Sequence, residues 1–266
     1  MSIVGSLRKL FAPTQQPMGA DASPLPERAG DHWTNQWLPA RCALCTDPCM
    51  RVVCAPCEGA LVRVPEESCP RCKLPSSNAE VCGRCLRYPP RWDRLATTFM
   101  YEFPLDRLVV RAKHGRYWGV FEWAAAITHE DFSFASSTLI PVPPSPERLL
   151  ERGYDQAALF SKALGRRFSS RVDESAIIRI RETGTQATRN WVDRRKNVKH
   201  AFAATRSLAG EAVVLVDDVL TTGATLNECA RAAIDAGASS VNACVIARVN
   251  PPRARSRIQK FNRAVA

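Results

Sequence analysis

The segment VVLVDDVLTTGAT, residues 213–225, joins four aliphatic residues to two carboxylates and then to a short turn rich in threonine. The aliphatic run predicts a parallel strand that is buried on both faces. Asp217 and Asp218 follow this run, at the carboxyl end where open α/β sheets bind ligands. The turn offers backbone N–H groups and hydroxyls at the start of a helix, which favour a phosphate group. The segment therefore predicts a site for a sugar phosphate, with the carboxylates on the sugar hydroxyls.

The turn after the strand carries the predicted phosphate site. Gly223 lets the backbone approach an anion closely, because glycine has no side chain. An ordinary helix N-cap would explain one carboxylate, but it does not require two carboxylates and three threonines around a glycine. The predicted phosphate-binding residues are Thr221, Thr222, Gly223, Ala224 and Thr225.

All thirteen positions of segment 213–225 fit a known pattern. The segment resembles the phosphoribosyl diphosphate (PRPP) binding motif of type I phosphoribosyltransferases. The resemblance implies that Asp217 and Asp218 bind the ribose 2′- and 3′-hydroxyls, and that Mg²⁺ bridges diphosphate and ribose oxygens. The two carboxylates would be the catalytic groups, because they stabilise the positive charge that develops at the anomeric carbon as diphosphate leaves.

Eight of the eleven cysteines form four CxxC pairs, a spacing typical of metal ligands. We expect structural zinc, one or two ions, with iron–sulfur as the alternative metal and a disulfide framework as the alternative without metal. Sequential pairing is the simplest arrangement, and crossed pairing stays open. The predicted ligands are Cys42, Cys45, Cys54, Cys57, Cys69, Cys72, Cys82 and Cys85.

The other three cysteines do not fit the CxxC pattern. Cys49 lies between two pairs and is expected to be a spare thiol. Cys229 and Cys244 fall in apolar helix and strand patterns, so we expect them to be small buried hydrophobic residues.

Composition divides the chain into four parts. Residues 1–40 are rich in proline and polar residues and are expected to be disordered. Residues 41–90 form a double zinc ribbon, which has few aliphatic residues and needs metal for its folding energy. Residues 91–250 form an α/β domain with a parallel sheet flanked by helices, because strand and helix patterns alternate there. Residues 251–266 form a basic tail.

Hydrophobic periodicity predicts the elements of the α/β domain. The predicted strands are 95–103, 137–143, 176–180, 213–219 and 241–249. The predicted helices are 105–113, 156–168 and 224–236, with Gly237 ending the last of these.

Basic residues accompany the predicted site. Arg148 and Arg152 follow the strand 137–143, where arginine can bind diphosphate in bidentate fashion; the alternative is a proline-rich connection with Asp155 as helix N-cap. The segment 183–202 predicts a mobile flap that closes over polyphosphate, or a solvated charged helix. Its positive charges are Arg189, Arg194, Arg195, Lys196 and Lys199.

Taken in order, these pieces resemble the ComF family of competence-associated proteins, from Cys42 to about Arg248. The family has a double zinc ribbon, a Lys-x-Gly turn as at Lys113, an RG-aromatic-NQ element, a Gln…Arg-x-x-Asn-Val segment and the PRPP motif. Asp155 stands here where the family usually has asparagine. The family residues that we assign to PRPP binding, beside the motif itself, are Lys113, Arg152 and Arg194.

The formal net charge of +11 favours polyanionic partners such as nucleotides or nucleic acid. The basic tail is either solvated or a nucleic-acid contact. No apolar run approaches the roughly 20 residues that span a bilayer, so we expect a cytoplasmic protein without membrane insertion. The resemblance implies a PRPP-dependent phosphoribosyltransferase in DNA uptake or nucleotide salvage. The alternative is a non-catalytic factor that binds PRPP or a nucleotide and processes single-stranded DNA, alone or with DNA-uptake proteins.

Overall fold

The computed structural model describes residues 41–114, 117–129, 132–181 and 198–251, which all lie within one compact unit. Three predictions fall wholly or mostly outside these residues: the disordered extension, the basic flap with Arg194, and the basic tail. The predicted domain boundaries stay predictions. No helix in the described part of the chain is long and apolar enough to cross a membrane.

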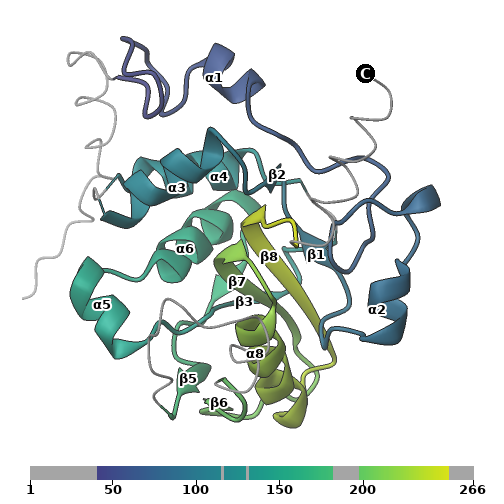
Figure 1. Ribbon diagram of the computed structural model, residues 1–266. Helices are drawn as coiled ribbons and strands as arrows, with labels where there is room; N and C mark the ends of the chain where they lie inside the picture. The colour runs from purple at the N-terminus through teal and green to yellow at the C-terminus, as the bar shows by residue number, and fades with distance from the viewer. Residues whose placement is uncertain (1–40, 115–116, 130–131, 182–197, 252–266) are drawn as a thin grey trace, which may run out of the picture. The chain divides into compact units, whose positions relative to one another are not determined.

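A parallel sheet forms the centre of the α/β region, as the sequence predicts (Figure 1). The strand order is β1-β8-β7-β3-β4, and β2 pairs with the last part of β8. Because β7 runs parallel to both β3 and β8, the carboxyl ends of these strands meet at one edge. The bounds are β1 Leu95–Ala96, β2 Phe99–Met100, β3 Thr138–Pro141, β4 Arg171–Val172, β7 Ala212–Leu220 and β8 Ser240–Arg248.

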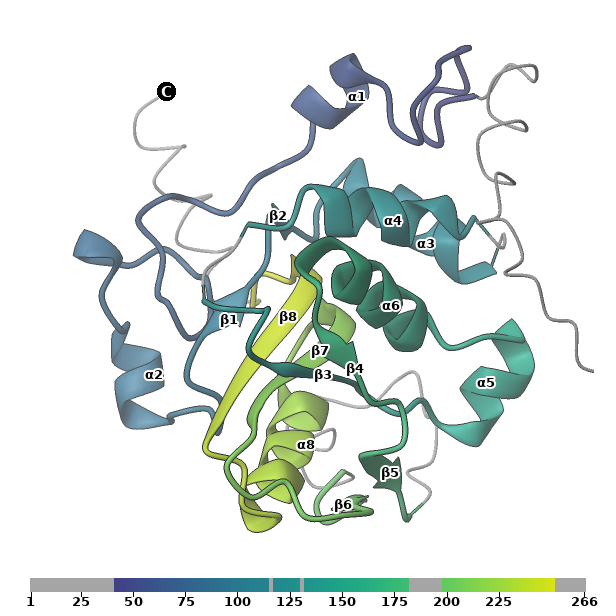
Figure 2. The ribbon, with the colours of Figure 1, turned by 180° about the vertical axis from the view of Figure 1, so that it is seen from behind.

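Helices cover the sheet on both faces. Figure 1 shows α3, α4 and α6 on one side and α8 on the other, and Figure 2 shows the same layers from behind. The helix α5 connects β3 to α6. The bounds are α3 Leu105–His114, α4 Gly119–Ala126, α5 Pro146–Arg152, α6 Gln156–Phe168 and α8 Ala224–Asp235.

Alternate residues of β7 enter two different hydrophobic cores, because successive side chains of a strand point to opposite faces. Val214 and Val216 lie in the core that contains residues of α3, α4 and α6. Val213 and Leu215 lie in the core that contains residues of α8. All four side chains are completely buried. The prediction of a strand covered on both faces is therefore confirmed.

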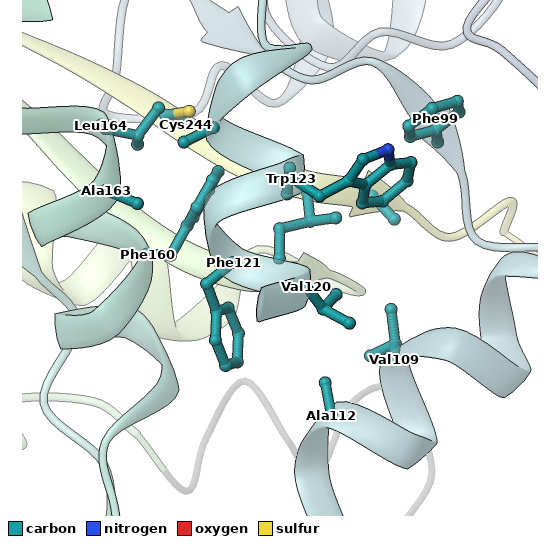
Figure 3. Packing of buried hydrophobic residues seen from close by; sticks show 14 of the residues in the cluster. Phe99, Val109, Ala112, Val120, Phe121, Trp123, Phe160, Ala163, Leu164 and Cys244 are labelled. Atoms are coloured by element: carbon teal, nitrogen blue, oxygen red, sulfur yellow. The ribbon is translucent and has the colours of Figure 1, made fainter. Parts of the chain in front are cut away.

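The larger core packs aromatic side chains of α4 and α6 against the sheet (Figure 3). Phe160 is fully buried, and Trp123 stacks on Phe99 with ring centroids 5.7 Å apart. Cys244 of β8 joins this core and Cys229 of α8 joins the other, and both are buried as expected.

Two predicted strands differ from the structure. The strand expected over 95–103 is divided into β1 and β2, because Thr98 turns its carbonyl oxygen to the N–H of Val64 in the cysteine-rich region. The strand over 176–180 exists as β5 (Ile177–Arg179), but it pairs antiparallel with β6 (Phe202–Ala204) in a separate sheet. Ile178 is exposed while Ile177 is buried, and such one-sided burial suits an antiparallel pair.

Two helices of the α/β region, α4 and α5, were not predicted from the pattern. The sequence of α4 is apolar nearly all round, so it shows no amphipathic period; five of its eight residues are buried. The helix α5 begins at Pro146, after a Ser145 side chain that accepts a hydrogen bond from the Arg148 N–H. Its start follows the usual N-cap rule, although its neighbouring prolines favour a loop.

The cysteine-rich region has two halves of the same construction. Each half begins with a CxxC turn and a single β-bridge, Arg41 to Pro48 in the first half and Ser68 to Pro75 in the second. Each then ends in a short helix that starts after a cysteine and carries another: α1 (Ala55–Gly59) after Cys54 and α2 (Gly83–Arg87) after Cys82.

Candidate functional site

The eight CxxC cysteines form two clusters in the sequential pairing. The sulfur atoms within each cluster lie within 4.8 Å of one another. Four sulfurs at this spacing suit one tetrahedral structural metal ion, and zinc is the usual one. The clusters are Cys42, Cys45, Cys54 and Cys57, and Cys69, Cys72, Cys82 and Cys85.

Backbone N–H groups point at the cluster sulfurs and favour thiolates, the form that binds metal. The Sγ of Cys42 accepts from the N–H groups of Leu44 and Cys54, each at 3.4 Å. Although burial raises the pKa of Cys42, these N–H groups lower it to about 6. In the second cluster, the neighbouring Cys85 thiol and the Leu74 N–H lower the pKa of Cys72 to about 5, against the effect of burial.

The predicted carboxylate pair lies half-buried at the carboxyl end of β7. Lys113, at the end of α3, places its Nζ 2.7 Å from the Oδ2 of Asp218. Asp217 accepts the Asp218 N–H on its Oδ1 at 2.8 Å. Burial and the neighbouring Asp218 carboxylate raise the pKa of Asp217 to about 7, although that N–H and Lys113 act in the opposite direction. The structure thus brings Lys113 to the carboxylate pair.

The turn after β7 has the backbone conformation that lets an anion approach closely. Gly223 has a φ of +78°, in the left-handed region, and α8 begins at the next residue. The Thr222 hydroxyl accepts the Ala224 N–H at 3.1 Å, so this side chain closes the turn from within. A Cβ at Gly223 would lie 2.8 Å from the ring of Trp92. Glycine is therefore needed both for the backbone angle and for the space.

The segment between α5 and α6 lies beside the end of α3. The Tyr154 hydroxyl donates to the carbonyl oxygen of Ala112, the residue before Lys113. Asp155 caps α6 by accepting the Ala158 N–H at 3.1 Å, and burial raises the pKa of its carboxyl group. This capping role is the alternative that the sequence left open for Asp155.

Arg152 and Gln156 each have one side-chain nitrogen that makes no hydrogen bond within the described residues. The Arg152 Nη1 donates to the Gln156 Oε1. The Arg152 Nε and the Gln156 Nε2 are buried without a partner in that part of the chain. Since orphaned buried donors are rare, these two groups suit an anionic ligand at this end of the site.

Sequence reasoning missed Arg248 and Trp92. Both lie beside the turn after β7, and both contact the second half of the cysteine-rich region: Trp92 donates from its indole to the Arg71 carbonyl oxygen at 2.8 Å. In the sequence, Arg248 is a charged residue at the end of an apolar strand pattern, and this position was the one signal that could have assigned it to the site. Between this half and the turn lies a cavity of about 280 Å³, lined among others by Arg84, Tyr88 and Lys199.

Replacing Gly223 by alanine is expected to lower the free energy of unfolding by about 2 kcal/mol or more. The left-handed backbone strains any side chain, and the new Cβ would also overlap Trp92. Gly210 is a matched control, because it has a φ of +76° but nothing within 4 Å of its would-be Cβ. Urea unfolding of both variants measures the difference. Equal losses of stability would show that the Trp92 contact does not constrain the turn.

The chain matches the family model described as "Phosphoribosyl transferase domain" over residues 155–263. It is 32% identical over 223 residues to the DNA utilization protein YhgH of Escherichia coli O6:H1 (strain CFT073), covering 79% of this chain and 98% of the relative. It is 33% identical over 181 residues to competence protein F of Haemophilus influenzae, covering 64% of this chain and 79% of the relative.

A further relative is competence protein ComFC of Bacillus subtilis, 28% identical over 214 residues, covering 74% of this chain and 84% of the relative. Among solved structures, a purine phosphoribosyltransferase from Pyrococcus horikoshii aligns over 52% of this chain and 86% of that chain, with 18% identity and a TM-score of 0.31. The first of these relatives is covered over 98% of its own length. The chain belongs to the ComF family of competence-associated proteins, with a domain of the phosphoribosyltransferase type.

Proposed function

We propose that this protein binds PRPP with Mg²⁺ and transfers its phosphoribosyl group to an acceptor, in a process of DNA utilisation or nucleotide salvage. One observation carries the proposal: the carboxylate pair stands directly before an open phosphate turn, with Lys113 at 2.7 Å from Asp218. This combination offers groups for the ribose, the phosphate and the diphosphate of one ligand.

Each part of PRPP has a chemical counterpart in this site. The 5′-phosphate lies on the turn from Thr221 to Thr225, at the positive end of the α8 dipole. Asp217 and Asp218 accept hydrogen bonds from the ribose hydroxyls. Lys113 and Arg152 attract the diphosphate, and the Arg152 Nε has no competing partner among the described residues. Arg194 lies outside those residues and stays a predicted member of this group.

The reaction breaks the bond between the anomeric carbon and diphosphate. Positive charge develops on the ribose as this bond lengthens, and two carboxylates at a preorganised position stabilise it. Carboxylate oxygens at this edge of the sheet also suit Mg²⁺, which prefers oxygen ligands and, when bound, neutralises charge on the leaving diphosphate. The eight cluster cysteines hold zinc in a structural role, because four sulfurs leave no open position on the metal.

The link to DNA rests on the relatives and on charge. The three relatives described above are named for DNA utilization or for competence. The net charge of +11 favours a second candidate, a non-catalytic factor in which the same pocket binds PRPP or a nucleotide while the cysteine clusters and the basic tail contact single-stranded DNA.

Calorimetric titration of the full chain with PRPP, with and without MgCl₂, tests the proposal. We expect binding that is stronger with Mg²⁺, and no binding of ribose without phosphate. Release of diphosphate in the presence of candidate bases and amines then separates the transferase from the non-catalytic factor. Absence of PRPP binding under both conditions would refute the transferase, and absence of nucleotide binding in the same titration would refute the second candidate as well.

A further inference from the structure

Arg248 is the last residue of β8 and lies between the phosphate turn and the second cysteine cluster. Its side chain is 2% exposed. The Nη1 donates to the carbonyl oxygens of Leu220 at 2.9 Å and of Thr221 at 2.6 Å. The Nε donates to the carbonyl oxygen of Cys72 at 3.0 Å. One buried guanidinium thus joins the start of the turn to a cluster ligand.

The bonds to Leu220 and Thr221 set the direction of the backbone N–H groups in the turn. In a planar trans peptide the C=O and the following N–H point in opposite directions. The Leu220 carbonyl oxygen also accepts the Val249 N–H at 2.9 Å, whereas Arg248 is the donor to the Thr221 carbonyl oxygen. Because both carbonyl oxygens face Arg248, the N–H groups of Thr221 and Thr222 point away from it. These are two of the donors that a bound phosphate would use.

Arg248 also places a positive charge behind the turn. No carboxylate lies within ion-pair distance of it in the described parts of the chain. A buried arginine stays protonated near neutral pH, and burial of its charge is costly even with the cysteine thiolates of the second cluster beside it. A phosphate on the other side of the turn would lower that cost, and the attraction acts over a short, poorly screened path.

The second cysteine cluster is bonded to the Arg248 side chain on the side away from the turn. Cys72 supplies both a cluster sulfur and the carbonyl oxygen that receives the Arg248 Nε. Trp92 makes a parallel connection, because its indole donates to Arg71 while its ring lies against Gly223. Among the described residues, the first cluster has no hydrogen bond to this turn: its Ala43 carbonyl oxygen accepts from Arg111 of α3 instead.

We propose that Arg248 is a positioning residue for the phosphate turn, and that it makes phosphate affinity depend on the metal in the second cysteine cluster. The inference rests on the proposed function, because it concerns the same phosphate site. It adds a role for the cysteine-rich region beyond its own stability: that region fixes the backbone on which the ligand lies.

The first test replaces Arg248 by methionine and by lysine and measures the affinity of the full chain for ribose 5-phosphate. We expect Arg248→Met to weaken binding about tenfold or more, and Arg248→Lys to restore part of it, because lysine keeps the charge but cannot reach three carbonyl oxygens. Arg206→Met is the matched control, since Arg206 is tied to Asp173 and Glu211 away from the turn. Thermal melting of all three variants shows the change in stability.

Arg248 has no positioning role if Arg248→Met weakens binding no more than Arg206→Met at a similar loss of melting temperature. Arg248→Lys keeps the test decisive even where the methionine variant folds poorly: affinity equal to wild type would overturn the inference. If wild type binds PRPP but not ribose 5-phosphate, this inference falls and the proposed function stands. If the protein binds PRPP without turning it over, the transferase reaction is refuted and the inference about Arg248 still stands.

The second test compares the two clusters. Cys82→Ser is expected to lose the metal of the second cluster and to weaken ribose 5-phosphate binding about fivefold or more. Cys45→Ser is expected to lose the metal of the first cluster with the affinity unchanged. Metal content measured on the same samples confirms which site is empty. Equal affinities in the two variants would contradict the coupling between the second cluster and the turn.

Discussion

Replacing both Asp217 and Asp218 by asparagine is expected to lower the rate of diphosphate release from PRPP about 100-fold or more. Asparagine keeps an oxygen that accepts a hydrogen bond from a ribose hydroxyl, but it carries no negative charge. The variant therefore loses stabilisation of the charged transition state while PRPP binding changes less. Steady-state measurement of kcat and KM checks this. A wild-type kcat in the variant would rule out catalysis by the carboxylates.

A stability measurement on Asp217→Asn alone tests how the buried carboxylate affects folding. The pKa of Asp217 is raised from 3.8 to about 7 in the folded protein by burial and by Asp218, so the folded state binds this proton more tightly than the unfolded state. The stability that Asp217 contributes is present below about pH 4 and is lost as the pH rises through about 7. Asp217→Asn removes the carboxylate, so it should exceed wild type in stability at pH 8, with a smaller difference near pH 4. Urea unfolding at both pH values measures this, and equal stabilities at pH 8 would contradict it.

Removing metal from both cysteine clusters with a strong chelator is expected to unfold the cysteine-rich region. Structural zinc contributes roughly 10–16 kcal/mol of apparent binding free energy in small modules, as much as the whole stability of a typical domain. The core around the second cluster contains little besides cysteine: Leu74 and Met100 are its other buried members. A metal-sensitive dye should report about two zinc ions per chain, one for each cluster. Tryptophan fluorescence and the melting temperature should both fall when the metal is released. Added zinc should restore both.

Cysteine variants provide the control for this experiment. Cys49 belongs to neither cluster, and its thiol donates to the Arg51 carbonyl oxygen at 2.8 Å. Cys49→Ser should therefore keep both metal ions, whereas Cys57→Ser should lose one. Full metal content in Cys57→Ser would mean that the first cluster is not a metal site.

The parts of the molecule that follow local rules could be predicted from the sequence. The alternation of Val213 to Val216 between two cores is a property of one strand, and the helix that starts after Gly223 follows from the turn. The cluster composition follows from the CxxC spacing, although the pairing needed the structure. Each of these features depends on residues that are close together in the chain.

The contacts between distant segments could not be predicted in this way. Arg248 and Cys72 are 176 residues apart, and neither carries a local signal for the other. Lys113 was assigned to the site by family resemblance, but its ion pair with Asp218 depends on how α3 packs. The burial of α4 on nearly all sides removed the amphipathic period that would have revealed it. In each case tertiary packing supplies the information that the local pattern lacks.

The two ends of the site should differ in their rate of amide hydrogen exchange, because β7 lies in the centre of the sheet and α5 does not. Residues Val213 to Val216 of β7 pair with both β3 and β8, and their side chains are buried on both faces, so hydrogen exchange there should require opening of the whole sheet. The helix α5 at the other end of the site has no buried residue, and its Leu150 is 85% exposed. Local opening should therefore be frequent around α5 and rare at the carboxylates. If the proposed function holds, adjustment of shape on binding would fall to the side of α5, and the side of the carboxylates would stay fixed.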